Sequence, residues 1–265
     1  MGLAAKWPLL LVPLVLVLLR GVASSYAGDR NILKPDAAGF DKFVRASPRP
    51  VFVKFYNPSC PHCVKMHRTW TSLAANLKKH VRVAAVNCQE SSLCSRWGVR
   101  GVPDIKLFLC RGKDKTIVPV DYRGDRSEAS LVAFFKSEQP SEVVRISSTG
   151  TTSLQKFLDT KPHLPHVIMA KERGEITMGL KTLSTKYSGK LVVGVASASK
   201  EGSSLATQLG VTLPTGADGG KALIIVPAGE KTKGELYKGE HSLTDIDKYL
   251  AGYIKSSRVS EKPEL

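Results

Sequence analysis

Hydrophobic residues change their spacing repeatedly along the chain, and the pattern predicts strands that alternate with helices. Val51–Tyr56 is a compact run of β-branched and aromatic residues between Pro50 and Asn57-Pro58, which is typical of a buried strand. Apolar residues then recur at helical spacing, at Val64, Met66, Trp70, Leu73, Ala74 and Leu77. A tight turn must therefore join this strand to the next helix.

The rest of the first half continues this alternation. A helix is expected before the strand, at residues 35–44. After it we expect a strand at 81–87, a helix at 91–97, strands at 105–109 and 117–122, and a helix at 127–136. This order predicts an α/β fold whose partly parallel sheet is covered by helices on both faces.

The second half repeats the order after a break. Gln139-Pro140-Ser141-Glu142 and the polar residues 147–153 mark the break, which separates predicted domains at residues 28–140 and 150–255. Helices are expected at 154–158, 177–187, 202–209 and 243–254, and strands at 166–170, 191–196, 222–226 and 235–237. The pattern indicates one fold used twice, followed by a tail at residues 256–265.

Residues 1–27 have the order of a signal peptide. Lys6 precedes an apolar run from Trp7 to Leu19, and small residues follow it. Cleavage after Ala27 or after Ser24 fits the small-residue pattern. The run is shorter than the ~20 residues of a membrane span, which favours a signal peptide that is removed. A retained signal anchor is the alternative interpretation. A signal peptide predicts an oxidising compartment, with no membrane span once it is removed.

Composition and charge narrow the possible classes of protein. Of the 265 residues, 42% are hydrophobic and 23% are charged, which excludes a disordered or fibrous chain. The net charge is +16, but the basic residues are scattered and do not interleave with aromatic residues. We interpret them as a solvated surface and predict no nucleic-acid partner.

The candidate chemistry lies in Cys60-Pro61-His62-Cys63, at the start of the predicted helix. A thiolate that attacks a disulfide forms a mixed disulfide, which a neighbouring thiol must resolve. Pro61 suits the first helical position, and the sulfur of Cys60 would face unpaired N–H groups and the positive end of the helix dipole. We therefore expect Cys60 to be the nucleophile and Cys63 the resolving thiol, with His62 as a further stabiliser of the thiolate.

Two other interpretations of this motif stay open. Half of a zinc site would need a second Cys or His pair at ligand spacing, and Cys88 and Cys94 lie too far apart for that pattern. A purely structural disulfide is the other alternative. No metal and no cofactor are predicted.

Residues 30–140 resemble the thioredoxin superfamily, and most closely the catalytic domains of the protein disulfide isomerase family. The resemblance is carried by Phe55-Tyr56-Asn57-Pro58-Ser59-Cys60-Pro61-His62-Cys63, Trp97-Gly98-Val99-Arg100-Gly101-Val102-Pro103, Leu107-Phe108 and Tyr122-Arg123-Gly124-Asp125-Arg126. It implies two tandem thioredoxin-like domains, the first redox-active and the second cysteine-free, with Leu213-Pro214 at the place of Val102-Pro103. An ordinary trans proline is the alternative to the cis Pro103 that the family carries.

The resemblance also implies roles for individual residues. Val102 and Pro103 would bind the backbone of a substrate peptide, and Arg126 would lower the pKa of the resolving thiol. Cys88 and Cys94 would form a structural disulfide. Cys110 is expected to be a small buried hydrophobic residue or, if exposed, a site of intermolecular pairing.

Three departures from the family change the picture. The dipeptide between the cysteines is Pro-His and not Gly-His, which favours an oxidase over a reductase, and Ser59 replaces an aromatic residue. Lys54 occupies the place of a buried glutamate that relays protons, and Ala85 that of its lysine partner. Lys54 would either act as a proton-accepting amine or extend to solvent.

The sequence thus predicts a thiol:disulfide oxidoreductase and isomerase of the secretory pathway. Its partners would be unfolded or partly oxidised client proteins and an upstream thiol oxidant or glutathione. The alternative is a chaperone or partner-binding module with secondary redox activity. Lys262-Pro263-Glu264-Leu265 resembles a retrieval signal of the endoplasmic reticulum, so we expect residence in its lumen, with secretion as the alternative.

Overall fold

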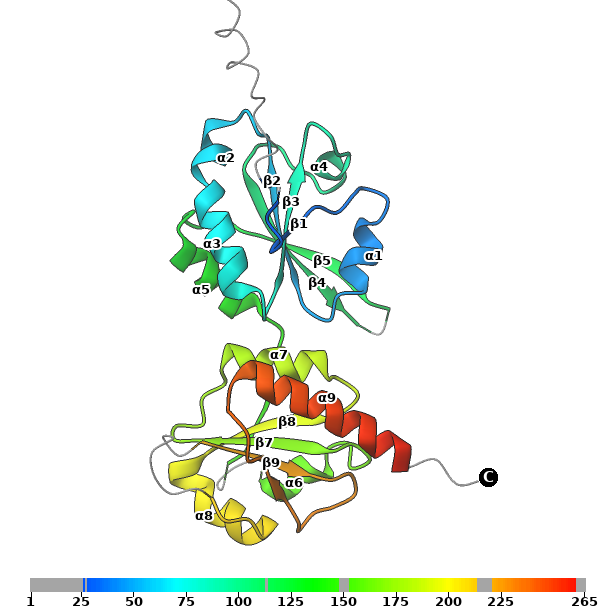
Figure 1. The fold of residues 1–265 in the computed structure, drawn as a ribbon, viewed down its shortest axis with the longest axis vertical. Coiled ribbons are helices and arrows are strands. Elements are labelled where there is room, and N and C mark those ends of the chain that lie inside the picture. Colours follow the sequence, from blue (N-terminus) through cyan, green and yellow to red (C-terminus); the bar gives the residue numbers. More distant parts are fainter. Residues whose placement is uncertain (1–25, 27, 113, 148–152, 214–220, 261–265) are drawn as a thin grey trace, which may run out of the picture. The chain divides into compact units, whose positions relative to one another are not determined.

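Strand β2 (Val51–Tyr56) lies at the centre of the first of two units (Figure 1). In this computed structural model, which describes residues 26, 28–112, 114–147, 153–213 and 221–260, the units divide between Phe135 and Lys136. All six residues of β2 are buried, which explains its continuous apolar run. Within these described ranges, no helix is long and apolar enough to cross a bilayer.

The sheet of the first unit is mixed. Its strand order is β1-β3-β2-β4-β5. Strands β1 (Ile32–Leu33) and β3 (Arg82–Asn87) run parallel to β2, whereas β4 (Asp104–Arg111) is antiparallel to β2 and to β5 (Thr116–Asp121). The end of β2, in the parallel half of the sheet, therefore leads directly to the helix that follows it.

Helices cover both faces of this sheet (Figure 1). On one face are α1 (Phe40–Arg45) and α4 (Leu93–Arg96), whose apolar residues pack against Val53 and Phe55. On the other are α2 (Pro61–Lys65), α3 (His67–Leu77) and α5 (Glu128–Glu138), and here the Trp70 ring lies 5.4 Å from that of Phe52. Alternate residues of β2 thus face opposite cores.

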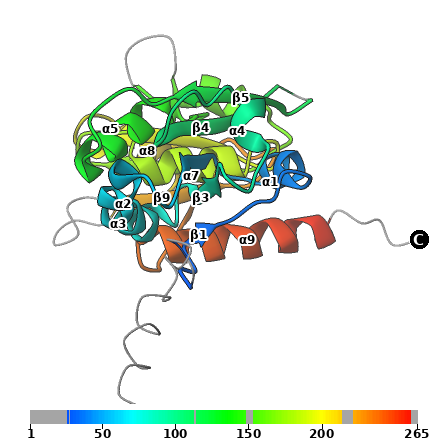
Figure 2. The same cartoon turned by 90° about the horizontal axis from the view of Figure 1, so that it is seen from above.

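The second unit has the same topology. Its sheet has the order β10-β9-β7-β8-β6, with β6 (Val144–Arg145), β7 (His166–Lys171) and β8 (Val192–Ser197) parallel and β9 (Ala222–Val226) and β10 (Glu235–Leu236) completing the antiparallel edge. Helices α7 (Met178–Lys186) and α9 (Leu243–Ser260) cover one face, and α6 (Leu154–Asp159) and α8 (Ala198–Leu209) the other. Figure 1 and Figure 2 both show α9 as one unbroken helix.

The two sheets confirm the predicted α/β class with two thioredoxin-like sheets, but several elements differ in extent. The first helix begins at Phe40 and not at residue 35, and the helix after Cys60 is divided at Met66. Helix α9 continues to Ser260, through residues that the sequence assigned to a tail. The unit boundary falls inside α5, upstream of the expected break.

Several predictions fall on residues that the structure does not describe. The signal peptide lies outside the described residues except for Tyr26, and the C-terminal four residues also lie outside them. The same holds for Pro214. The structure therefore does not test these predictions.

Candidate active site

Cys60 stands at the turn between β2 and α2. Its backbone is extended (φ −81°, ψ 121°) and it caps α2, with Pro61 at the first helical position. The turn is closed by two bonds to Asn57, whose Oδ1 accepts from the Ser59 N–H at 2.8 Å and whose carbonyl accepts from the Cys60 N–H at 3.1 Å. The short connection predicted from the sequence is thus built from an Asx turn and a helix cap.

The environment of Cys60 stabilises its thiolate. A hydrogen bond from the Cys63 backbone N–H lowers the pKa of Cys60 most; the Cys63 thiol, the His62 backbone N–H and the charge of Arg126 add to the effect. The His62 side chain is exposed, and it is the backbone N–H of His62 that contributes to the lowered pKa of Cys60. Cys60 is half-buried, and its Sγ lies 3.7 Å from the carbonyl oxygen of Val102.

Cys63 has the opposite environment. Only 3% of it is exposed, and burial raises the pKa of its thiol. Neither cysteine is bonded to another sulfur in the structure. The two sulfurs therefore differ in access and in acidity.

Lys54 lies buried beneath this pair. It is 1% exposed, and its Nζ donates to the Tyr26 hydroxyl oxygen at 2.5 Å and to the Cys63 carbonyl oxygen at 3.1 Å. Ala85 is its partner on β3, as the resemblance to the family implied. Burial lowers the pKa of Lys54 to about 8, although the nearby Cys63 and Cys60 act in the other direction. Of the two alternatives for this lysine, extension to solvent is wrong.

Tyr26 belongs to this cluster, and sequence reasoning missed it. Its ring is 1% exposed, stacks on His67 at 4.6 Å and meets Tyr56 edge to face at 5.3 Å. It lies within residues 1–27, which the sequence assigned to a signal peptide and so excluded from the fold. The one hint in the sequence that Tyr26 belongs to the fold was that the two possible cleavage positions, after Ser24 and after Ala27, lie on either side of it.

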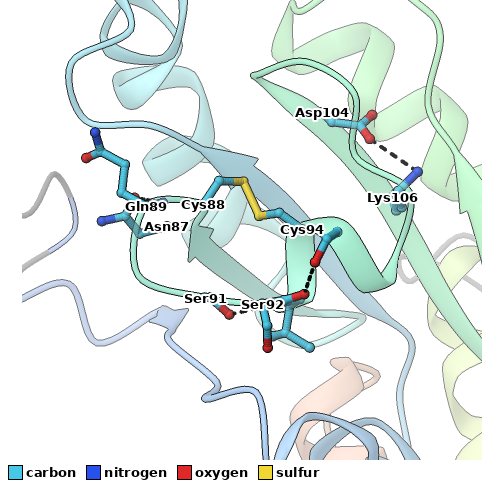
Figure 3. Close-up of a disulfide and its surroundings, with 10 residues drawn as sticks. Asn87, Cys88, Gln89, Ser91, Ser92, Cys94, Asp104 and Lys106 are labelled. Carbon is cyan, nitrogen blue, oxygen red and sulfur yellow. Dashed lines mark hydrogen bonds and ion pairs between the residues drawn. A yellow bond between two sulfur atoms is a disulfide. The ribbon is translucent and has the colours of Figure 1, made fainter.

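The segment before β4 completes the site. The Val102–Pro103 peptide bond is cis and Pro103 is buried. The start of β4 is held by Lys106, whose Nζ lies 3.2 Å from a carboxylate oxygen of Asp104 (Figure 3) and 2.6 Å from one of Asp121. The Val102 carbonyl is thereby presented to Cys60 from a fixed strand end.

Arg126 lies near the site but is exposed. Its charge lowers the pKa of both Cys60 and Lys54. Among the described contacts, no hydrogen bond joins it to Cys63. The observed arrangement thus relates Arg126 to the first cysteine more than to the second.

Cys88 and Cys94 form a disulfide in the structure, between the end of β3 and α4 (Figure 3). Their Cα atoms are 5.5 Å apart, and they are separated by six positions in the sequence. Cys110 is a half-buried free thiol that donates to the Val44 carbonyl at 3.6 Å, and burial raises its pKa. Neither feature lies in the Cys60 motif itself.

Comparisons with known proteins identify a matching family and several relatives of this chain. Residues 31–137 match the family model described as Thioredoxin. A mitochondrial thioredoxin domain-containing protein of Schizosaccharomyces pombe is 35% identical over 161 residues, which are 60% of this chain and 44% of that protein. Protein disulfide-isomerase 1 of Dictyostelium discoideum is 34% identical over 145 residues, which are 49% of this chain and 38% of that protein.

The solved structures include one whose match extends over most of this chain. The crystal structure of ERdj5 form II matches with a TM-score of 0.64 and 24% identity, over 86% of this chain and 30% of that one. At this identity the likeness shows the fold alone. The chain spans less than half the length of each of these three proteins.

Proposed function

Residues 31–137 form a thioredoxin domain with homologues in the protein disulfide isomerase family, and from this premise we propose that the chain is a thiol:disulfide oxidoreductase and isomerase. One observation carries the proposal: Cys60 is accessible and has a lowered pKa, whereas Cys63 is buried and has a raised pKa. This asymmetry separates an attacking thiolate from a resolving thiol. Clients would be proteins that acquire disulfides in the secretory pathway.

Oxidation of a client begins from the Cys60–Cys63 disulfide. A client thiolate attacks the more accessible sulfur, that of Cys60; the S–S bond breaks, and Cys63 leaves as a thiolate. A second client thiolate then attacks the client sulfur of the mixed disulfide and releases Cys60. The client gains a disulfide, the pair becomes a dithiol, and an external disulfide such as oxidised glutathione or an oxidant protein regenerates it.

Isomerisation begins from the dithiol. The Cys60 thiolate attacks a client disulfide, and the released client thiolate can attack elsewhere in its own chain. If that attack fails, Cys63 must attack Cys60 to release the client, and for this it must first lose its proton. Lys54, which contacts the Cys63 carbonyl, is the group we assign to this step: its neutral amine accepts the proton, and the ammonium so formed stabilises the thiolate.

Replacement of the nucleophile tests the function. We expect Cys60→Ser in the full chain to abolish both insulin reduction and the refolding of scrambled ribonuclease. Cys110→Ser is the matched control, because it removes a half-buried thiol outside the motif and should retain both activities. Activity that survives Cys60→Ser would contradict the proposal.

A client-binding role of the second unit is the second candidate. It is favoured by an open cavity of about 570 Å³ in that unit, whose lining combines apolar residues such as Leu164 and Tyr253 with polar ones such as Lys190. An extended client segment with an apolar side chain suits such a surface. The double replacement Cys60→Ser and Cys63→Ser should then still suppress aggregation of a reduced client, and an unchanged aggregation rate would argue against this role.

Residence in the endoplasmic reticulum is part of the proposal. It is supported by the order of charged, apolar and small residues at the start of the sequence and by the Lys-Pro-Glu-Leu end. Microscopy of the full chain with an internal tag, beside a lumenal marker, tests it. Mitochondrial staining, as the name of the Schizosaccharomyces pombe relative suggests, would contradict it.

A further inference from the structure

We propose that Tyr26 is a positioning residue for the redox pair: its hydroxyl holds the buried Lys54 ammonium beside Cys63 and thereby favours the thiolate of the resolving cysteine. The inference rests on the proposed function for its biological meaning. The relationship among Tyr26, Lys54 and Cys63 can be measured without any activity assay.

The buried charge of Lys54 is compensated by hydrogen-bond acceptors. An ammonium has three donors and is costly to bury without partners. Within the described residues, no carboxylate lies within ion-pair distance of Lys54, and its partners are the Tyr26 hydroxyl oxygen and the Cys63 carbonyl oxygen. Its Nζ also lies 5.1 Å from the ring centre of Tyr26 and 5.8 Å from that of Tyr56. Tyr26 is thus the residue that supplies both an acceptor and a close aromatic ring.

Tyr26 itself is fixed in place. His67 stacks on one side of its ring and Tyr56 packs against it edge to face. Its carbonyl accepts from the Asp29 N–H at 3.4 Å. Since the ring is 1% exposed, its hydroxyl has little freedom to leave Lys54. The Tyr26 hydroxyl oxygen is therefore preorganised: it already lies in place before Lys54 becomes charged.

Lys54 and Cys63 each influence the ionisation of the other through their charges. The pair can exist as amine and thiol or as ammonium and thiolate, and the Tyr26 oxygen stabilises the ammonium. The lowered pKa of Lys54 and the raised pKa of Cys63 bring these two states closer in free energy. Other titratable or charged groups that act on Lys54, Tyr26 or Cys63 are Asp29, Tyr56, Cys60, His67 and Arg126. They remain in place when only the Tyr26 hydroxyl is removed.

The test titrates Cys63 alone, in full chains that carry Cys60→Ser and Cys110→Ser, by the ultraviolet absorbance of the thiolate. Tyr26→Phe keeps the ring but removes the acceptor, and we expect it to lower the thiolate-to-thiol ratio of Cys63 about tenfold at a given pH. Tyr56→Phe is the matched control, because the ring of Tyr56 borders Lys54 while its hydroxyl makes no described bond to it; this variant should leave the titration unchanged.

A double-mutant cycle with Lys54→Met separates positioning from general packing. Lys54→Met should lower the thiolate ratio in the same direction, and Tyr26→Phe should have no further effect when Lys54 is absent. The proposal is overturned if Tyr26→Phe leaves the Cys63 titration unchanged, or if it shifts that titration equally with and without Lys54. Should Tyr26→Phe not fold, an unchanged titration in Lys54→Met would overturn it as well.

A kinetic measurement connects the inference to turnover. In chains with both cysteines, Tyr26→Phe should slow escape from a mixed disulfide with glutathione about tenfold at neutral pH, while alkylation of Cys60 keeps its rate. The loss should diminish as the pH rises. Failure of the proposed function would appear as activity in Cys60→Ser, whereas failure of this inference appears in the Cys63 titration, so the two can be told apart.

Discussion

The Sγ of Cys60 lies 3.7 Å from the carbonyl oxygen of Val102, although 42 positions separate the two residues in sequence. A thiol can donate to that carbonyl, whereas a thiolate has no proton to donate. The contact therefore belongs to the protonated state, and the N–H groups of Cys63 and His62 stabilise the ionised one. When Cys60 ionises, its sulfur exchanges the Val102 carbonyl for N–H groups of its own helix as hydrogen-bond partners.

Alkylation should follow this difference in environment. In the reduced protein at neutral pH, we expect iodoacetamide to modify Cys60 at least about tenfold faster than Cys110, because only the Cys60 pKa is lowered while burial raises the other. Peptide mass spectrometry of quenched samples measures both rates. Similar rates at the two cysteines would contradict the assignment of Cys60 as the stabilised thiolate.

The reduction potential should be that of an oxidising pair. Stabilisation of the Cys60 thiolate favours the dithiol, and we expect a value near the ~−180 mV of protein disulfide isomerase, or higher. Equilibration of the purified protein in glutathione buffers, followed by thiol trapping, measures it. A potential near the ~−270 mV of thioredoxin would show that the Pro61-His62 dipeptide does not favour oxidation here.

Lys54 should make stability depend on alkaline pH. Its pKa is about 8 in the folded chain and ~10.4 when unfolded, so between these values the unfolded state binds more protons and the free energy of unfolding rises with pH. In a background without Cys60 and Cys63, the parent should gain up to about 3 kcal/mol relative to Lys54→Met across this range. Urea unfolding at a series of pH values measures the difference, and a constant difference would be inconsistent with a buried amine.

The Cys88–Cys94 disulfide should stabilise the first unit without taking part in turnover. Its loop is short, with a sequence separation of six, for which chain entropy suggests about 2 kcal/mol. Cys88→Ala with Cys94→Ala should lower the free energy of unfolding by about that amount in denaturant titrations. Insulin reduction measured well below the unfolding midpoint should persist; its loss would assign this disulfide a redox role.

Most of this fold could be predicted because its long elements carry strong hydrophobic patterns. The continuous apolar run of β2 and the helical spacing after Cys63 placed the motif at a strand-to-helix turn, and the structure has it there. The two-residue strands β1 and β6 were missed because so short a segment shows no period. Met66 was taken as interior to one helix, but it lies at the break between α2 and α3.

The site was predictable only where the chemistry is local. Cys60 and Pro61 act through the helix start, which sequence spacing reveals. The fate of Lys54 depended on burial, and its partner Tyr26 lies 28 positions away on a segment without periodic structure. Contacts of this kind depend on tertiary packing, which no local pattern in the sequence encodes.

The burial of Tyr26 also bears on how the protein is made. Cleavage after Ala27 would remove Tyr26 and leave the Lys54 ammonium with the Cys63 carbonyl as its described acceptor, whereas cleavage after Ser24 would retain Tyr26 as the second residue of the mature chain. We expect the mature protein to keep this residue, and N-terminal sequencing checks it. Signal peptidase would then determine, by a shift of three residues, whether the mature protein carries the phenol that holds its buried lysine.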